Sequence, residues 1–60
     1  MPATNAYYRV EVNGRYSTIH ATRASAIAKA RREAKLHPNA RVIVTRVLKS
    51  GMAMLVNWRA

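Results

Sequence analysis

Only two glycines occur in this chain of 60 residues, and both follow a polar residue that favours turns, in Asn13-Gly14 and Ser50-Gly51. Asn-Gly is a strong signal for a two-residue hairpin turn because both residues tolerate positive φ. The segments around both turns are rich in β-branched and aromatic side chains, which is typical of strands. The sequence therefore predicts two hairpins, with strands at about 7–12, 15–20, 41–48 and 52–59.

The segment between the two hairpins is rich in alanine and other good helix formers, which predicts a helix at about 23–37. Thr22 or Ser25 can serve as its N-cap, and Pro38 restricts the preceding residue and ends it. The expected core-facing stripe consists of Ile27, Ala30 and Ala34, flanked by Ala24 and Ala26.

A helix that joins two hairpins gives the element order ββαββ. This order predicts an α+β fold with a four-stranded antiparallel sheet, strand order 2-1-3-4, because that order keeps every pair of neighbours antiparallel. One helix covers only one face of such a sheet. We expect a single domain over residues 1–60, with residues 1–6 as a flexible tail.

The length of each turn decides which side chains share a face of the sheet. A two-residue turn at Asn13-Gly14 pairs Val12 with Arg15, and it leaves a polar and aromatic face made of Tyr7, Arg9, Glu11, Tyr16, Thr18 and His20. The second turn has two residues or three. With Ser50-Gly51 alone, one face holds Ile43, Thr45, Val47, Met54, Val56 and Trp58, and the other holds Val42, Val44, Arg46, Leu48, Leu55, Asn57 and Arg59.

The second hairpin is apolar on both faces, although the helix covers one face only. A monomer would leave several of these side chains in water, and the last strand is poorly protected as a free edge. The sequence therefore predicts a homodimer with Val42, Val44, Leu48 and Leu55 at its interface.

The chain has eleven Lys and Arg against two acidic residues, a formal net charge of +9, while half of its residues are hydrophobic. This composition indicates a folded domain with an anionic partner. The densest predicted patch is the helix cluster Lys29, Arg31, Arg32 and Lys35, in which Lys29 alone has an acidic neighbour, Glu33, at helical spacing. A second candidate surface combines cations and aromatic rings on one face of the first hairpin, namely Tyr7, Arg9, Tyr16, Thr18 and His20, and Arg15 beside the turn is a further candidate that could reach a groove from the hairpin tip.

Catalysis and metal binding find little support in the sequence. There is no Cys and no Asp, and Glu11 and Glu33 belong to different elements. His20 and His37 lack an evident third ligand, and the serines lack a base and an orienting acid. We expect a protein that is not an enzyme and has no metal and no cofactor.

The sequence contains no apolar run of about 18 residues and no secretory pattern at its start, so we expect no membrane span and a cytoplasmic location, at the nucleoid if the partner is DNA. It contains no ribonucleoprotein motif, zinc-finger spacing or leucine heptad.

The favoured hypothesis is a non-enzymatic protein that binds DNA or RNA mainly through phosphates, with low sequence specificity. The main alternative is a small interaction module, an adaptor or inhibitor of the phage or mobile-element type, that docks on an acidic protein surface. A third possibility is an accessory subunit of a ribosome or capsid. Charge alone does not separate these classes because electrostatic steering serves them equally.

Overall fold

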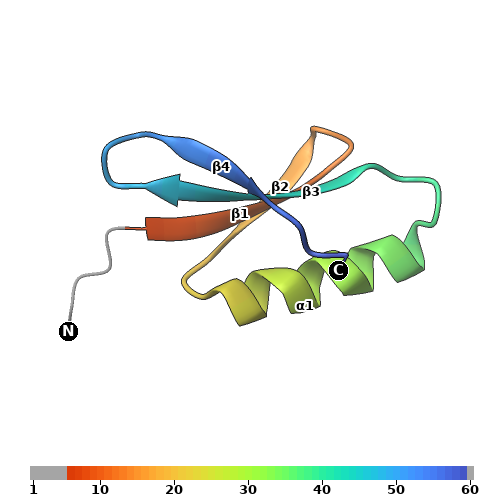
Figure 1. The fold of residues 1–60 in the computed structure, drawn as a ribbon. Coiled ribbons are helices and arrows are strands. Elements are labelled where there is room, and N and C mark those ends of the chain that lie inside the picture. Colours follow the sequence, from red (N-terminus) through yellow and green to blue (C-terminus); the bar gives the residue numbers. More distant parts are fainter. Residues whose placement is uncertain (1–5, 60) are drawn as a thin grey trace.

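A computed structural model describes residues 6–59 of the protein. Its elements are β1 (Ala6–Val12), β2 (Tyr16–His20), α1 (Arg23–Leu36), β3 (Val42–Leu48) and β4 (Ala53–Val56). The strands form one antiparallel sheet in the order β2-β1-β3-β4, and α1 lies on one face of it (Figure 1). The predicted α+β fold and strand order are thus confirmed. Apart from Ala6, which begins β1, the predicted tail lies outside the described residues.

Local signals at the helix ends act as predicted. Thr22 is the N-cap, since its Oγ1 accepts a hydrogen bond from the Ser25 backbone N–H at 3.2 Å. At the other end, the His37 N–H donates to the Glu33 carbonyl at 2.8 Å, and Pro38 follows. The helix ends at Leu36, one residue before the predicted boundary.

The core lies between α1 and the two central strands. Its buried side chains are Val10, Val12, Val42 and Val44 from the sheet, Ala26 and Ala30 from α1, and Trp58. The two alanines are fully buried, so the helix backbone approaches the sheet closely. The predicted core-facing stripe was wrong in detail: Ala26 lies at its centre, Ile27 is half-buried at its edge, and Ala24 is exposed.

The predicted pairing of the first hairpin was wrong by one residue. Asn13 and Gly14 have the expected positive φ, 57° and 71°, but Val12 pairs with Tyr16 rather than Arg15. The turn is held by the residue that precedes β3, because the Asn13 N–H donates to the Arg41 carbonyl at 2.8 Å and the Asn13 Oδ1 accepts from the Arg41 N–H at 3.0 Å.

This one-residue shift reverses the faces of β2 relative to the prediction. Thr18 and His20 lie on the helix side, where the His20 Nδ1 is 2.9 Å from the Ser25 Oγ. Ile19 takes their place beside Arg9 on the opposite face and is exposed.

The turn of the second hairpin has three residues, Lys49 to Gly51, which is one of the two predicted alternatives. The Gly51 N–H donates to the Leu48 carbonyl, φ of Gly51 is 95°, and β3 pairs with β4 through Val44 and Val56. The faces drawn for a two-residue turn are therefore wrong for β4.

The last strand was predicted to end at residue 59. Strand β4 ends at Val56 instead, because the chain then leaves the sheet. Trp58 turns into the core, and its indole N–H donates to the Val42 carbonyl at 3.1 Å. The C-terminal segment is thereby held on the helix side of the sheet (Figure 1).

The burial pattern overturns half of the predicted dimer interface. Val42 and Val44 are core residues under α1, so neither reaches a second subunit. Leu48 is half-buried on the helix side, whereas Leu55 is 80% exposed on the opposite face.

Candidate nucleic-acid interface

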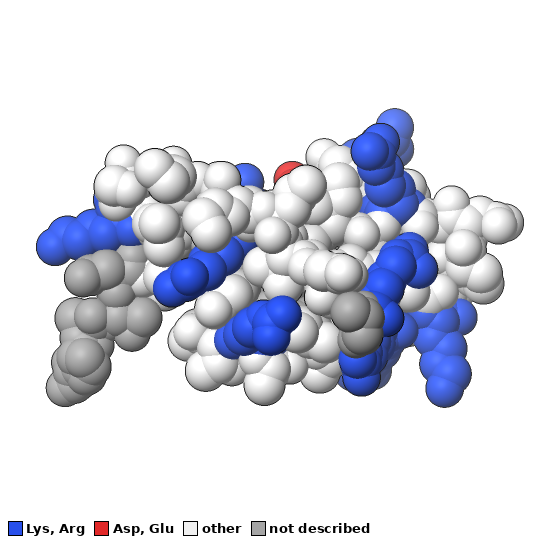
Figure 2. All heavy atoms as spheres, in the orientation of Figure 1, with Lys and Arg blue, Asp and Glu red and all other residues white. Residues whose placement is uncertain are grey.

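The positive charge of the chain is largely without acidic counterparts. Figure 2 shows Lys and Arg side chains spread across the visible face, with acidic atoms visible only at its upper edge. Eleven cations share two carboxylates, so at least nine (11 − 2) have no side-chain carboxylate of their own.

One predicted pairing is confirmed. The Lys29 Nζ lies 2.9 Å from the Glu33 Oε2, and both side chains are largely buried against the domain. The His37 Nε2 is 3.8 Å from the other carboxylate oxygen of Glu33. Lys29 therefore serves this ion pair and does not belong to an open basic patch.

The hydrogen bond from Lys29 holds the pKa of Glu33 below its ordinary value of 4.5, although burial acts in the opposite direction. The charges of Lys29, His37 and Arg32 lower this pKa further. Because the folded pKa is the lower one, the charged carboxylate stabilises the fold above pH 4.5, and this stabilisation is lost as the pH falls through the folded pKa.

We expect Glu33→Gln to flatten the acid limb of the stability profile. The amide keeps the shape of the side chain but removes the titrating group, so the unfolding temperature of the wild type should fall more steeply below pH 4.5 than that of the variant. Circular dichroism melts at a series of pH values measure both profiles. Parallel acid limbs would show that the Lys29 pair does not stabilise the fold.

A groove runs along the flank of α1 that faces away from β2. Ser25 contacts His20 of β2, and Ile27 lies about 200° farther round the helix, on the flank toward β3. The groove has a volume of about 530 Å³ and is lined by Arg23, Ala24, Ile27, Ala28 and Arg31. We call it the α1 groove.

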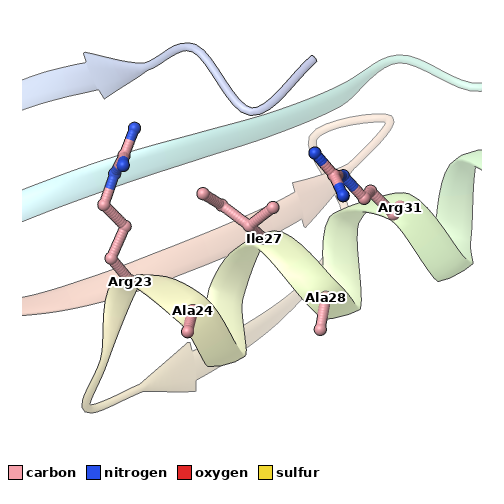
Figure 3. Close-up of a pocket in the computed structure, with 5 residues that line it drawn as sticks. All are labelled: Arg23, Ala24, Ile27, Ala28 and Arg31. Atoms are coloured by element: carbon pink, nitrogen blue, oxygen red, sulfur yellow. The ribbon is translucent and has the colours of Figure 1, made fainter. Parts of the chain in front are cut away.

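In the α1 groove, Arg23 and Arg31 extend on the same side of the helix as Ile27, which lies between them (Figure 3). The two arginines are eight residues apart, about 12 Å along the helix axis, so they suit two different phosphates better than one. Ala24 and Ala28 add little bulk, which leaves room for a phosphodiester strand. Apolar surface between two guanidinium groups also suits the sugar edge of such a strand.

Two further arginines lie on the helix side of the sheet. Arg46 is exposed and lies on the same face of β3 as buried Val44. It pairs with Tyr8 of β1, and Tyr8 pairs on its other side with His20, which comes shortly before α1 begins. Arg59 follows Trp58, and its guanidinium carbon lies 4.4 Å from the centroid of the indole ring. We define the basic flank as Arg23, Arg31, Arg46 and Arg59.

The predicted binding residues do not form one surface. Arg31, Arg32 and Lys35 are exposed on α1, and of these Arg31 alone lines the α1 groove. Tyr7 and Arg9 lie on the face of the sheet opposite α1, and Arg15 is exposed in the first turn. The side chain of Tyr16 lies outside the part that the structure describes.

The residues predicted from the sequence did not include Arg23, Arg46 and Arg59. A signal for Arg23 was present, since residues 23, 27 and 31 recur every fourth position and share a helix flank. Arg46 and Arg59 join this side only through the strand register and the burial of Trp58, which no local pattern predicts.

Other site types find no support among residues 6–59. These residues contain no group of three or more His, Asp or Glu side chains able to hold a metal ion. His20 and His37 are engaged with Ser25 and Glu33. The described helix is also too short and too polar to cross a bilayer.

The chain matches no protein-family model, no curated protein and no solved structure. The interpretation of the basic flank therefore depends on its own residues.

Proposed function

We propose that this protein binds nucleic acid through the sugar-phosphate backbone, with the basic flank as its main contact surface and without catalysis. The observation that carries the proposal is the α1 groove, where two arginines flank a small apolar floor and no acidic residue lines the wall. Arginine suits this role because its planar guanidinium donates two parallel hydrogen bonds to phosphate.

Low sequence specificity is part of the proposal. The α1 groove offers two guanidinium groups, which we assign to phosphates, and aliphatic side chains, and it has no Asn, Gln or acidic side chain that would add contacts to base edges. Phosphate contacts fix a protein on nucleic acid but carry no direct sequence information.

Titrations of duplex DNA, single-stranded DNA and RNA of equal length over a salt series test this function. If the four arginines of the basic flank each neutralise one phosphate, the logarithm of the duplex association constant should fall with log salt at a slope of about −3 to −4. Duplexes of unrelated sequence should bind with similar affinity. Absence of binding at low salt, or affinity that does not change with salt, would contradict the proposal.

A separate measurement addresses docking on an acidic protein surface. Polyglutamate of matched length presents carboxylates without the phosphodiester backbone, and we expect it to bind more weakly than single-stranded DNA at every salt concentration. Equal affinity would indicate that any polyanion suffices, which would favour the protein-docking alternative.

A further inference from the structure

We propose that the face of the sheet opposite α1 is the surface on which a second copy of this chain binds. Side chains alternate between the two faces along each strand, so the neighbours of the buried valines point away from the helix. We call this surface the open face; it consists of Tyr7, Arg9, Glu11, Ser17, Ile19, Ile43, Thr45, Val47, Ala53 and Leu55.

Six of the ten side chains on the open face are apolar or aromatic, and the face is uncovered. Leu55 is 80% exposed, Ile19 60% and Tyr7 36%, while Ile43 and Val47 are half-buried between them. Helix α1 contacts β1, β2 and β3 on the other side, and no described element crosses the open face (Figure 1). Apolar surface of this kind on a small domain marks an interaction site.

The charge on this face selects the occupant. The open face carries one cation, Arg9, and one acid, Glu11, so its formal charge is zero, whereas the remaining ten cations (11 − 1) lie elsewhere. An anionic partner is drawn to those other surfaces. Another chain of charge +9 is repelled by them, and the neutral face is where it can approach.

Strand order and register define a self-complementary arrangement. Ile19, Arg9, Thr45 and Leu55 form one row across the sheet, from edge to edge. A two-fold axis parallel to the strands, between β1 and β3, stacks two sheets about 10 Å apart with β1 of one copy over β3 of the other.

In this arrangement the large exposed side chains meet each other. Ile19 lies opposite the partner's Leu55, because β2 and β4 exchange places across the axis. Tyr7 lies opposite the partner's Val47, since these two residues share a row within one copy. Both helices then lie on the outside, with their basic flanks accessible, so the dimer does not depend on the proposed function and does not block it.

The size of the face predicts a weak dimer. The strands have 7, 5, 7 and 4 residues, and at about 3.3 Å per residue and about 4.8 Å between strands they cover roughly 360 Å² per copy, or about 730 Å² in total. Stable interfaces bury about 1,200–2,000 Å². Repulsion between two +9 chains weakens the dimer further, and salt screens that repulsion. Dimerisation should therefore strengthen as salt rises, whereas phosphate binding weakens.

Cysteine variants test the arrangement, since the natural chain has no cysteine. Ile19→Cys and Leu55→Cys are prepared separately and treated with a thiol cross-linker whose reach matches the sheet separation of about 10 Å. The mixture of the two variants should give covalent dimer, because residue 19 of one copy meets residue 55 of the other. Each variant alone should give little, because like residues lie at opposite edges.

Sedimentation over a concentration and salt series gives the dissociation constant. Leu55→Asp places a charge in the interface and should raise this constant at least about tenfold. The domain should stay folded, because Leu55 is 80% exposed within one copy. Three outcomes would overturn the inference: a monomer at all concentrations and salts, equal cross-linking of each single variant, or a dimer that Leu55→Asp leaves unchanged. A wild-type chain that binds nucleic acid but does not dimerise would refute this inference alone, and a wild-type chain that dimerises but does not bind nucleic acid would refute the proposed function alone.

Discussion

The double variant Arg23→Glu/Arg31→Glu should bind duplex DNA about 100-fold more weakly than the wild type at low salt. Each reversal removes an attraction to phosphate and adds a repulsion, and one unit charge about 4 Å from another in water contributes about 1 kcal/mol. The two lost attractions and the two added repulsions together exceed the free energy of a 100-fold effect, about 2.8 kcal/mol, even with partial screening. Fluorescence anisotropy with a labelled duplex measures the loss.

The fold should tolerate both reversals. Arg23 is the first residue of α1, where a negative charge is favoured by the helix dipole. Glutamate at position 31 has Lys35 four residues later, a favourable helical pair. Circular dichroism should therefore show an unchanged helix content, so that weaker binding reports on the surface and not on unfolding.

A matched control separates local contact from overall charge. Arg15→Glu/Arg41→Glu changes the net charge by the same amount, from +9 to +5 (9 − 4), at exposed positions around the first turn. We expect it to lose less than about tenfold, because neither Arg15 nor Arg41 lines the α1 groove. Equal losses in both double variants would contradict the basic flank as the binding surface.

The neutral counterparts measure how many phosphates are contacted. Arg23→Gln/Arg31→Gln should make the salt slope less negative by about 2, one unit for each lost contact. An unchanged slope with reduced affinity would mean that the two arginines affect binding through the structure of the protein and do not contact phosphate.

The parts of this fold that were predictable depend on local chemistry. Gly51 supplies positive φ, Thr22 caps a helix, and Pro38 follows its end; each signal acts within a few residues. The same holds for the pair of Lys29 with Glu33, which spans one helical turn. Strand order followed because one helix joining two hairpins leaves few ways to keep all neighbours antiparallel.

The strand register was not predictable from the turn alone. Asn13-Gly14 favours a two-residue turn, but its backbone and side chain are both engaged by Arg41, 28 residues away. This contact adds Arg15 to the turn, and one extra residue moves every side chain of β2 to the other face. The predicted surface of Tyr7, Arg9 and Thr18 was lost for this reason.

The candidate binding surface depends on the same long-range contacts. Arg23 and Arg31 belong to one helix, but Arg46 joins them through the sheet register, and Arg59 joins through Trp58. Within the predicted helix cluster, Lys29 pairs with Glu33 as expected, and Arg31 is the one member that lines the α1 groove. Net charge predicts an anionic partner, while tertiary packing determines which cations lie on the same side of the domain.

The largest effect on stability is expected from Trp58. It is the bulkiest side chain in a core otherwise made of valines and alanines, it is 7% exposed, and its N–H bonds the Val42 carbonyl. Truncation to alanine removes this packing and leaves a cavity, which costs about 3–5 kcal/mol for a buried tryptophan. A domain of this size is stable by only about 3–9 kcal/mol, so Trp58→Ala should be largely unfolded or close to it.

Two companion variants keep this expectation testable even if Trp58→Ala does not fold. Trp58→Phe retains an aromatic ring but loses the hydrogen bond to Val42, and we expect a loss of about 1 kcal/mol plus the cost of the smaller ring. Leu36→Ala removes a large apolar side chain that is 61% exposed at the end of α1, and it should change the free energy of unfolding by less than about 0.5 kcal/mol. Urea unfolding followed by circular dichroism measures all three. If Trp58→Ala were no more destabilising than Leu36→Ala, the C-terminal segment would not be part of the core, and Arg59 would lose the anchor that keeps it on the basic flank.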